Sequence, residues 1–116
     1  MSKLRAGVIG RTGCGDYGHG LDRVYLEMEE IEIVAVADDD PIGLNEAGNR
    51  LGTPNLYLDY QAMLEKETLD IVSICPRWVK PHLDMVIAVA EAGACIFLEK
   101  PMARTLAEAD AMIEAC

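Results

Sequence analysis

Basic residues are scarce in this chain of 116 residues. Ten lysines and arginines stand against twenty aspartates and glutamates, which gives a formal net charge of −10. Such a surface does not bind nucleic acid through its phosphates, because that binding needs clustered Lys and Arg. Long apolar runs are also missing, since the longest, Met85 to Ala90, is far too short to cross a bilayer. No basic segment followed by an apolar one opens the chain, so we expect a cytoplasmic protein.

Cysteine pairs at metal-binding or redox spacing are missing too. The four cysteines, Cys14, Cys75, Cys95 and Cys116, include no C-x-x-C pair, so we interpret them as reduced thiols and expect no metal site. Hydrophobic residues make up 51% of the chain and charged residues 26%, which excludes a disordered or fibrous protein. A chain of this length can bury one core, so we expect a single domain over residues 1–116.

Glycine, by contrast, is concentrated in one stretch that follows an apolar run. The run predicts a strand over residues 4–9, and the sequence Gly13-Cys14-Gly15-Asp16-Tyr17-Gly18 then satisfies the dinucleotide-binding pattern G-x-G-x-x-G. Apolar residues at helical spacing follow in Leu21 to Glu30, so the pattern predicts a loop that opens a helix. Glycines there allow a tight turn and let a pyrophosphate approach the N–H groups of the helix N-terminus.

Two registers of this glycine loop compete. The second register runs from Gly10 to Gly15. Its first and last positions are glycines, but Thr12 stands where the middle glycine of the motif belongs. The loop is therefore about three residues longer than the minimum. A surface turn with no ligand is the alternative to a phosphate-binding loop.

Strand-like and helix-like segments alternate along the rest of the chain. Apolar, often β-branched runs predict strands over residues 4–9, 31–37, 56–58, 71–74 and 94–98. Helices are predicted over residues 21–30, 41–51, 60 to about 67, 82–91 and from 105 onward. This alternation predicts an α/β fold, a doubly wound parallel (Rossmann) sheet of strand order 3-2-1-4-5. Its ligand crevice is expected at the carboxyl ends of the strands, between the first strand and the fourth.

Asp38 ends the second strand at that edge. It lies 25 residues beyond Gly13, near the spacing at which a carboxylate binds the adenine ribose of NAD. Together with Asp39 and Asp40 it would repel a 2′-phosphate, which favours NAD over NADP. Arg11 acts in the opposite sense, because a guanidinium binds phosphate or stacks on adenine. The alternative for the three aspartates is a strand-end turn that caps the next helix.

The residues after the fifth strand carry the most specific signal. The segment from Ala92 to Leu98, followed by Glu99-Lys100-Pro101, closely resembles the signature of the glucose-fructose oxidoreductase and inositol dehydrogenase family (Gfo/Idh/MocA). The resemblance spans essentially the whole chain. It implies NAD(P)-dependent oxidation or reduction of a sugar, cyclitol or related polyol. It also implies that Lys100 is catalytic, reaching both the nicotinamide and the substrate hydroxyl.

The loop chemistry and the resemblance together predict a set of cofactor-binding residues. They are Gly10, Arg11, Thr12, Gly13, Gly15, Asp38, Cys75, Pro76, Arg77, Trp78, His82, Glu99, Lys100 and Pro101. Three roles have two interpretations each. Trp78 either forms a wall of the nicotinamide pocket or anchors its loop against the sheet. Glu99 either orients Lys100 or the nicotinamide, or forms an exposed ion pair. His19 either contacts a phosphate or is a solvated or helix-terminus residue.

In this family a second α/β domain holds the substrate and supplies an acid/base His and an Asp. None of that domain is in this sequence, so we expect a fragment that binds dinucleotide without turnover, and a homo-oligomer in the full-length form. Two rival functions stand beside the enzyme. One is a non-catalytic NAD-binding sensor or regulatory module, and the other is a flavodoxin-like signalling domain that binds no dinucleotide.

Overall fold

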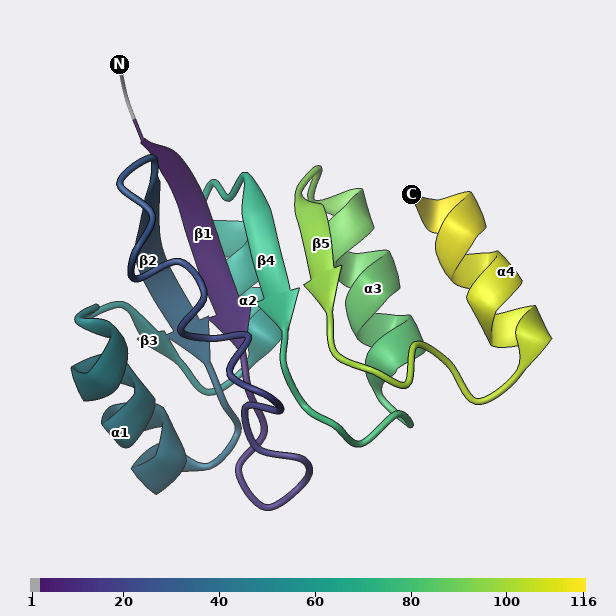
Figure 1. The fold of residues 1–116 in the computed structure, drawn as a ribbon, viewed down its shortest axis with the longest axis horizontal. Coiled ribbons are helices and arrows are strands. Elements are labelled where there is room, and N and C mark those ends of the chain that lie inside the picture. Colours follow the sequence, from purple (N-terminus) through teal and green to yellow (C-terminus); the bar gives the residue numbers. More distant parts are fainter. Residues whose placement is uncertain (1–2) are drawn as a thin grey trace.

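Five parallel strands form the centre of the structure, a computed structural model that describes residues 3–116 (Figure 1). The strands are β1 (Leu4–Ile9), β2 (Ile31–Ala37), β3 (Leu56–Tyr57), β4 (Ile71–Ile74) and β5 (Cys95–Leu98). Their order in the sheet is β3-β2-β1-β4-β5, and every neighbouring pair is parallel. The predicted fold class and strand order are therefore confirmed.

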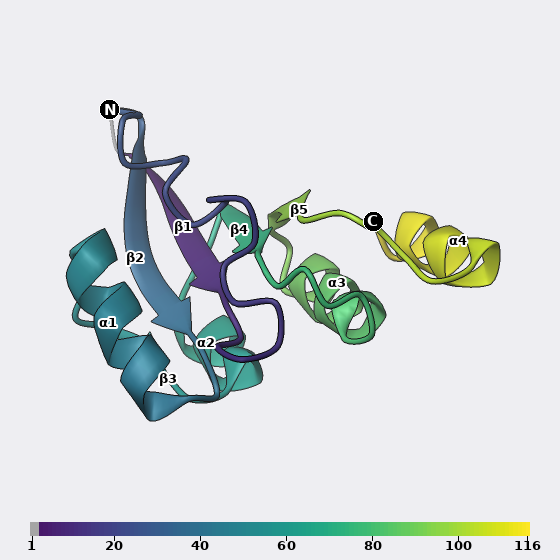
Figure 2. The same ribbon diagram turned by 60° about the horizontal axis from the view of Figure 1, so that its bottom comes forward.

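Helices cover both faces of this sheet. They are α1 (Pro41–Leu51), α2 (Tyr60–Lys66), α3 (His82–Glu91) and α4 (Leu106–Ala115). Figure 2 shows α1 on one side of the sheet and α2 and α3 on the other. Helix α4 packs against α3 beyond the β5 edge. Each of these four helices matches a helix predicted from the sequence.

Cap residues of the expected chemical types begin and end the helices. The Asp40 carboxylate accepts a hydrogen bond from the Gly43 amide at the start of α1, and Gly52 ends that helix with a φ of 72°. At α4, Thr105 Oγ1 accepts from the Glu108 amide at 3.1 Å. The Glu108 carboxylate binds Arg104 instead of the Thr105 amide, so Thr105 and Glu108 form only half of a capping box.

Two apolar layers pack on the two faces of the sheet. Side chains from the strands and from α2, α3 and α4 form the larger one: Ile9, Val34, Ala35, Ala37, Met63, Leu69, Val72, Ile74, Met85, Val86, Val89 and Met112. The α1 face carries the smaller one: Val8, Leu21, Val36, Leu44, Ala47, Leu51 and Cys75. Val8 and Ile9 of β1, and Val36 and Ala37 of β2, enter opposite layers, as the two-residue period of a strand dictates. The alternation breaks at Val34 and Ala35, which both lie in the larger layer where the pairing of β1 and β2 shifts register.

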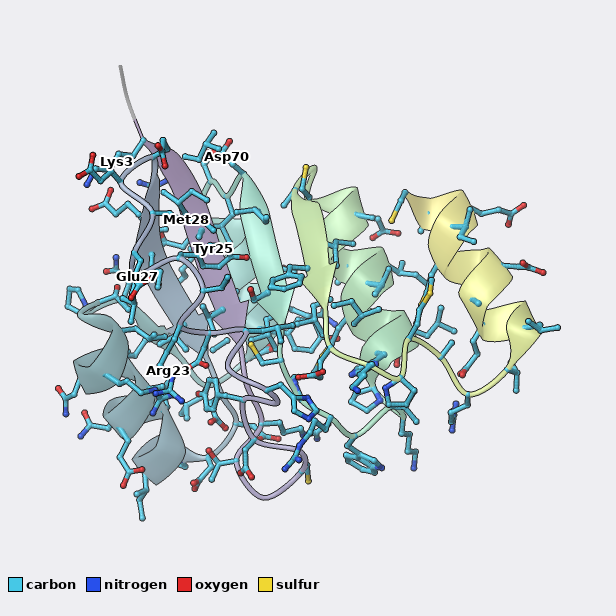
Figure 3. The ribbon with its side chains drawn as sticks, viewed as in Figure 1. Lys3, Arg23, Tyr25, Glu27, Met28 and Asp70 are labelled. Carbon is cyan, nitrogen blue, oxygen red and sulfur yellow. The ribbon has the colours of Figure 1, made fainter. Side chains whose placement is uncertain are left out.

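The helix predicted over residues 21–30 is wrong, because the structure has a series of turns there. Its amides reach back three residues instead of four: Arg23 to Gly20, Leu26 to Arg23 and Met28 to Tyr25. Residues Arg23 and Tyr25 of this segment are labelled in Figure 3, where the chain passes in front of β1 and β2.

Local chemistry explains why these turns do not become a helix. Glu27, Glu29 and Glu30 crowd the end at which a helix dipole is negative, so they disfavour that helix. The apolar spacing still serves packing, because Leu21 and Tyr25 are both buried against the sheet. The Tyr25 hydroxyl lies 2.7 Å from Ser73 Oγ in β4. The periodic pattern therefore predicted the buried residues correctly, but it predicted the wrong backbone conformation.

Candidate cofactor site

The predicted site residues gather where β1, β2 and β4 end. A cavity of about 230 Å³ opens at this edge, and its wall includes Gly10, Arg11, Asp38, Asp39, Tyr60 and Met85. Tyr60 and Met85 were absent from the sequence prediction. The signal for Tyr60 was its place just after β3, whose carboxyl end shares the edge, whereas Met85 reads as an ordinary core residue of α3.

The glycine loop is a tight hairpin rather than the start of a helix. Arg11 and Asp16 exchange backbone hydrogen bonds of 3.1 and 3.0 Å. Gly15 has a φ of 92° and packs on the loop after β4, where an added Cβ would lie 2.4 Å from the Arg77 nitrogen. Only glycine fits that conformation and that approach. The helix N-terminus predicted to hold a pyrophosphate is absent, so anion binding here would depend on loop amides and on the Arg11 side chain.

Asp38 is the hub that fixes this loop to β2. Its side chain is only 2% exposed, and its carboxylate accepts hydrogen bonds from Thr12 N, Thr12 Oγ1, the Tyr17 hydroxyl and Asp40 N. These distances run from 2.6 to 3.1 Å. Burial, and then the charge of Asp38, raise the pKa of the Tyr17 hydroxyl well above its ordinary value. A carboxylate has about four acceptor positions, so a ribose hydroxyl must displace one of these donors.

Arg11 and Trp78 lie together beside Asp39. The Arg11 Nε donates to Asp39 Oδ2 at 3.0 Å, and the guanidinium carbon is 5.6 Å from the centre of the Trp78 ring. Lys80 Nζ approaches the same ring at 5.8 Å. Because Trp78 is 41% exposed, its indole is not buried as an anchor against the sheet. It is a partly open aromatic surface between two cations.

Glu99 is buried, which excludes the exposed ion pair considered from the sequence. Its carboxylate is 3% exposed and accepts from the His19 amide at 2.5 Å, His19 Nδ1 at 3.0 Å and the Lys100 amide at 2.9 Å. Burial acts to raise the pKa of Glu99, but these hydrogen bonds outweigh it and the pKa is lowered. His19 is thereby tied to the end of β5, a role that neither of its two interpretations included.

Glu99 should make the stability of the domain depend on pH. A carboxyl with a lowered native pKa stabilises the fold above its ordinary value of 4.5, and this stabilisation is lost as the pH falls through the native pKa. Glu99→Gln should therefore lower the free energy of unfolding at pH 7, with the difference from wild type shrinking below about pH 4. Urea unfolding across this range tests the expectation. Glu65→Gln, at an exposed position of α2, is the control and should leave the free energy of unfolding unchanged. A loss of stability in Glu99→Gln that is the same at every pH would contradict the expectation.

Lys100 lies at the end of β5, with its backbone held and its side chain exposed. Within residues 3–116 its ammonium group makes no hydrogen bond or ion pair. The side chain borders a second cavity, of about 430 Å³, between β5 and α4. The peptide bond between Lys100 and Pro101 is cis. The free amine is thus available to a ligand at the carboxyl edge of the sheet.

Cys75, Pro76 and His82 are completely buried behind this edge. Burial is the main cause that raises the pKa of the Cys75 thiol above its ordinary value. Both ring nitrogens of His82 face backbone carbonyl oxygens, so no ring nitrogen is left for a cofactor. The structure thus brings the predicted residues to one edge but buries these three side chains beneath the surface.

The family assignment follows from comparison with known proteins. Residues 4–116 match the family described as "Oxidoreductase family, NAD-binding Rossmann fold". The chain belongs to the Gfo/Idh/MocA oxidoreductase family. The resemblance inferred from Glu99-Lys100-Pro101 is confirmed, and the chain is the NAD-binding Rossmann domain of that family.

Relatives of this Gfo/Idh/MocA domain are much longer proteins. A D-apiose dehydrogenase of Paraburkholderia graminis is 38% identical over 90% of this chain and 28% of its own length. A myo-inositol 2-dehydrogenase of Thermotoga maritima is 32% identical over 96% of this chain and 32% of its own length. An oxidoreductase from Agrobacterium radiobacter, solved with NAD+, L-tartaric acid and magnesium, superposes with a TM-score of 0.87 at 27% identity, covering 99% of this chain and 32% of that one. The chain thus spans about a third of the length of these relatives.

Three further properties concern the described part of this Gfo/Idh/MocA domain. All four cysteines are unpaired. Within residues 3–116 no three His, Cys, Asp or Glu side chains are grouped so as to hold a metal ion. None of the helices over these residues has the length and apolarity needed to cross a membrane.

Proposed function

We propose that residues 1–116 are the cofactor domain of an oxidoreductase that transfers a hydride between NAD(H) and the CH–OH group of a sugar, cyclitol or related polyol. One observation carries the proposal. Among residues 3–116, Lys100 presents an ammonium group without a hydrogen bond or ion pair at the carboxyl edge of the sheet, next to a buried Glu99 whose carboxylate accepts three hydrogen bonds. The names of the D-apiose and myo-inositol dehydrogenases support this class of substrate.

The residues at the cavity of about 230 Å³ fit the adenosine side of a dinucleotide. Tyr60 and Met85 provide apolar surface there, and Arg11 provides a cation. Asp38 would take the ribose hydroxyls by exchanging one of its present donors. Asp39 pairs with Arg11 and offsets its positive charge, so the attraction of Arg11 for a 2′-phosphate would be weakened and NAD preferred over NADP.

Lys100 would act on the reacting hydroxyl. When bound, NAD+ supplies the acceptor for the hydride. An amine at this edge can hold the substrate oxygen by a hydrogen bond and take its proton as the hydride leaves the carbon. Lys100 therefore has the chemistry of a general base for oxidation and a general acid for reduction.

The remaining expectations concern the whole protein. We place it in the cytoplasm and expect a second domain to bind the substrate, as the threefold greater length of the relatives suggests. Exposed apolar side chains near β5 and α4 support association into a homo-oligomer: Phe97, Met102, Leu106 and Ile113.

A turnover assay tests this function. The whole protein containing this domain should form reduced nicotinamide from NAD+ with D-apiose, myo-inositol or another member of a panel of sugars and cyclitols. The isolated domain should bind NADH and turn over none of them. Tight NADH binding without turnover in either direction by the whole protein would contradict the enzyme and favour an NAD-binding sensor or regulatory module.

A further inference from the structure

His82 occupies an unusual position for an ionisable residue. It is the first residue of α3 and is 0% exposed. Its Nε2 lies 2.6 Å from the Pro76 carbonyl oxygen, and its Nδ1 lies 2.9 Å from the Pro101 carbonyl oxygen. In either neutral tautomer the ring donates to one of these oxygens, and the imidazolium donates to both. One buried side chain thus bridges two loops that are 25 residues apart.

The two loops are the parts of the chain on which the proposed site depends. Pro76 follows β4 and precedes Arg77 and Trp78, which lie at the rim of the site. Pro101 follows Lys100 directly. The loops continue the sheet, because the Glu99 amide donates to the Ile74 carbonyl at 2.9 Å beyond the last paired residues of β4 and β5.

The backbone of Lys100 is consequently held from both sides. On the N-terminal side the Lys100 amide donates to the Glu99 carboxylate, and on the C-terminal side the Pro101 carbonyl faces His82. The ammonium group has no partner among residues 3–116. A fixed backbone restricts where the Lys100 side chain can reach, and its ammonium group remains available to bind a ligand.

We propose that His82 is a positioning residue, which fixes the Lys100–Pro101 turn and couples it to the loop of Arg77 and Trp78. The proposal rests on the proposed function, since it assigns His82 a part in that reaction. It replaces the direct cofactor contact predicted from the sequence, because the ring is fully buried and both its nitrogens face protein carbonyl groups. His82 acts on the reaction through Lys100.

Amide hydrogen exchange tests the coupling in this chain without any substrate. The Lys100 amide donates to Glu99 and the Arg77 amide donates to the Gly15 carbonyl, so both can report on their loops. His82→Leu should accelerate exchange of these two amides together, by about fivefold to tenfold, the effect of losing about one hydrogen bond. His82→Gln, which keeps a donor, should restore protection at one of the two loops. Val89→Ala is the matched control, because Val89 is a fully buried residue of α3 that lies two helical turns from His82. Val89→Ala should accelerate amide exchange in α3 without accelerating it in the two loops together.

Kinetics of the whole protein separate positioning from general stability. His82→Leu should lower kcat by about 10²-fold with KM for NAD+ nearly unchanged, as expected when a catalytic group is misplaced by about 1 Å. His82→Gln should recover part of kcat. Unchanged exchange at Lys100, or equal acceleration over the whole sheet, would overturn the proposal. A wild-type protein without turnover would instead contradict the proposed function, while the exchange data would still decide the role of His82.

Discussion

Lys100→Met should lower turnover of a sugar or polyol by the whole protein by about 10²–10⁴-fold, the range for loss of a general acid or base. NADH affinity should change little, because the amine is proposed to act on the reacting hydroxyl and the backbone contact to Glu99 is kept. A methionine has a similar length, so packing beside the cavity between β5 and α4 is retained. Steady-state kinetics and an NADH titration of the same preparation give the two values.

Lys66→Met is the control for this comparison. Lys66 is an exposed lysine at the end of α2, away from the carboxyl edge of the sheet, and its replacement should leave turnover and NADH affinity at the wild-type values. Wild-type turnover in Lys100→Met would show that the Glu99-Lys100-Pro101 segment does not take part in the chemistry. A loss of NADH binding as large as the loss of turnover would instead indicate that Lys100 acts by binding the cofactor.

Asp38→Ala should destabilise the domain by about 2–4 kcal/mol, because the donors on its carboxylate lose their acceptor in a buried place. The same change should release the glycine loop, which Thr12 and Tyr17 tie to β2, and should weaken NADH binding strongly. Chemical denaturation and an NADH titration measure the two effects.

Asp39→Ala is the matched control for Asp38. The Asp39 side chain is 53% exposed and, among residues 3–116, pairs with Arg11 alone, so its loss should cost less than about 1 kcal/mol. It should also free the Arg11 guanidinium and shift the preference toward NADPH. Equal destabilisation by the two substitutions would contradict the hub role of Asp38.

The parallel sheet could be predicted because its signals are local and repeated. Ile31–Ala37 is a β-branched, almost uninterrupted apolar run, as in a strand covered on both faces, and the cap residues Asp40, Asp59 and Thr105 mark helix starts by side-chain chemistry alone. Once strands and helices alternate, the right-handed crossover leaves few possible orders. The order 3-2-1-4-5 follows from that rule.

The failures arise where one sequence pattern fits two backbone conformations, or where contacts between distant residues decide the outcome. The apolar spacing of Leu21 and Tyr25 fits both a helix and a chain of turns, and the glutamates at the end of the segment favour the turns. For Asp38 the motif spacing shows a carboxylate at the right edge but not that Thr12 and Tyr17 occupy it. His82 likewise looks like a helix start in the sequence, since its two carbonyl partners are visible only in the fold.

NADH binding at the carboxyl edge of the sheet is the central claim, and Trp78 reports on it directly because it is the only tryptophan of the chain. Titration with NADH, and separately with NADPH, should quench Trp78 emission saturably and give energy transfer to the reduced nicotinamide. We predict a lower dissociation constant for NADH than for NADPH. Tighter binding of NADPH would indicate that Arg11 binds the 2′-phosphate at the adenosine end of the cofactor. Absence of any response in a folded protein would contradict the cofactor site itself.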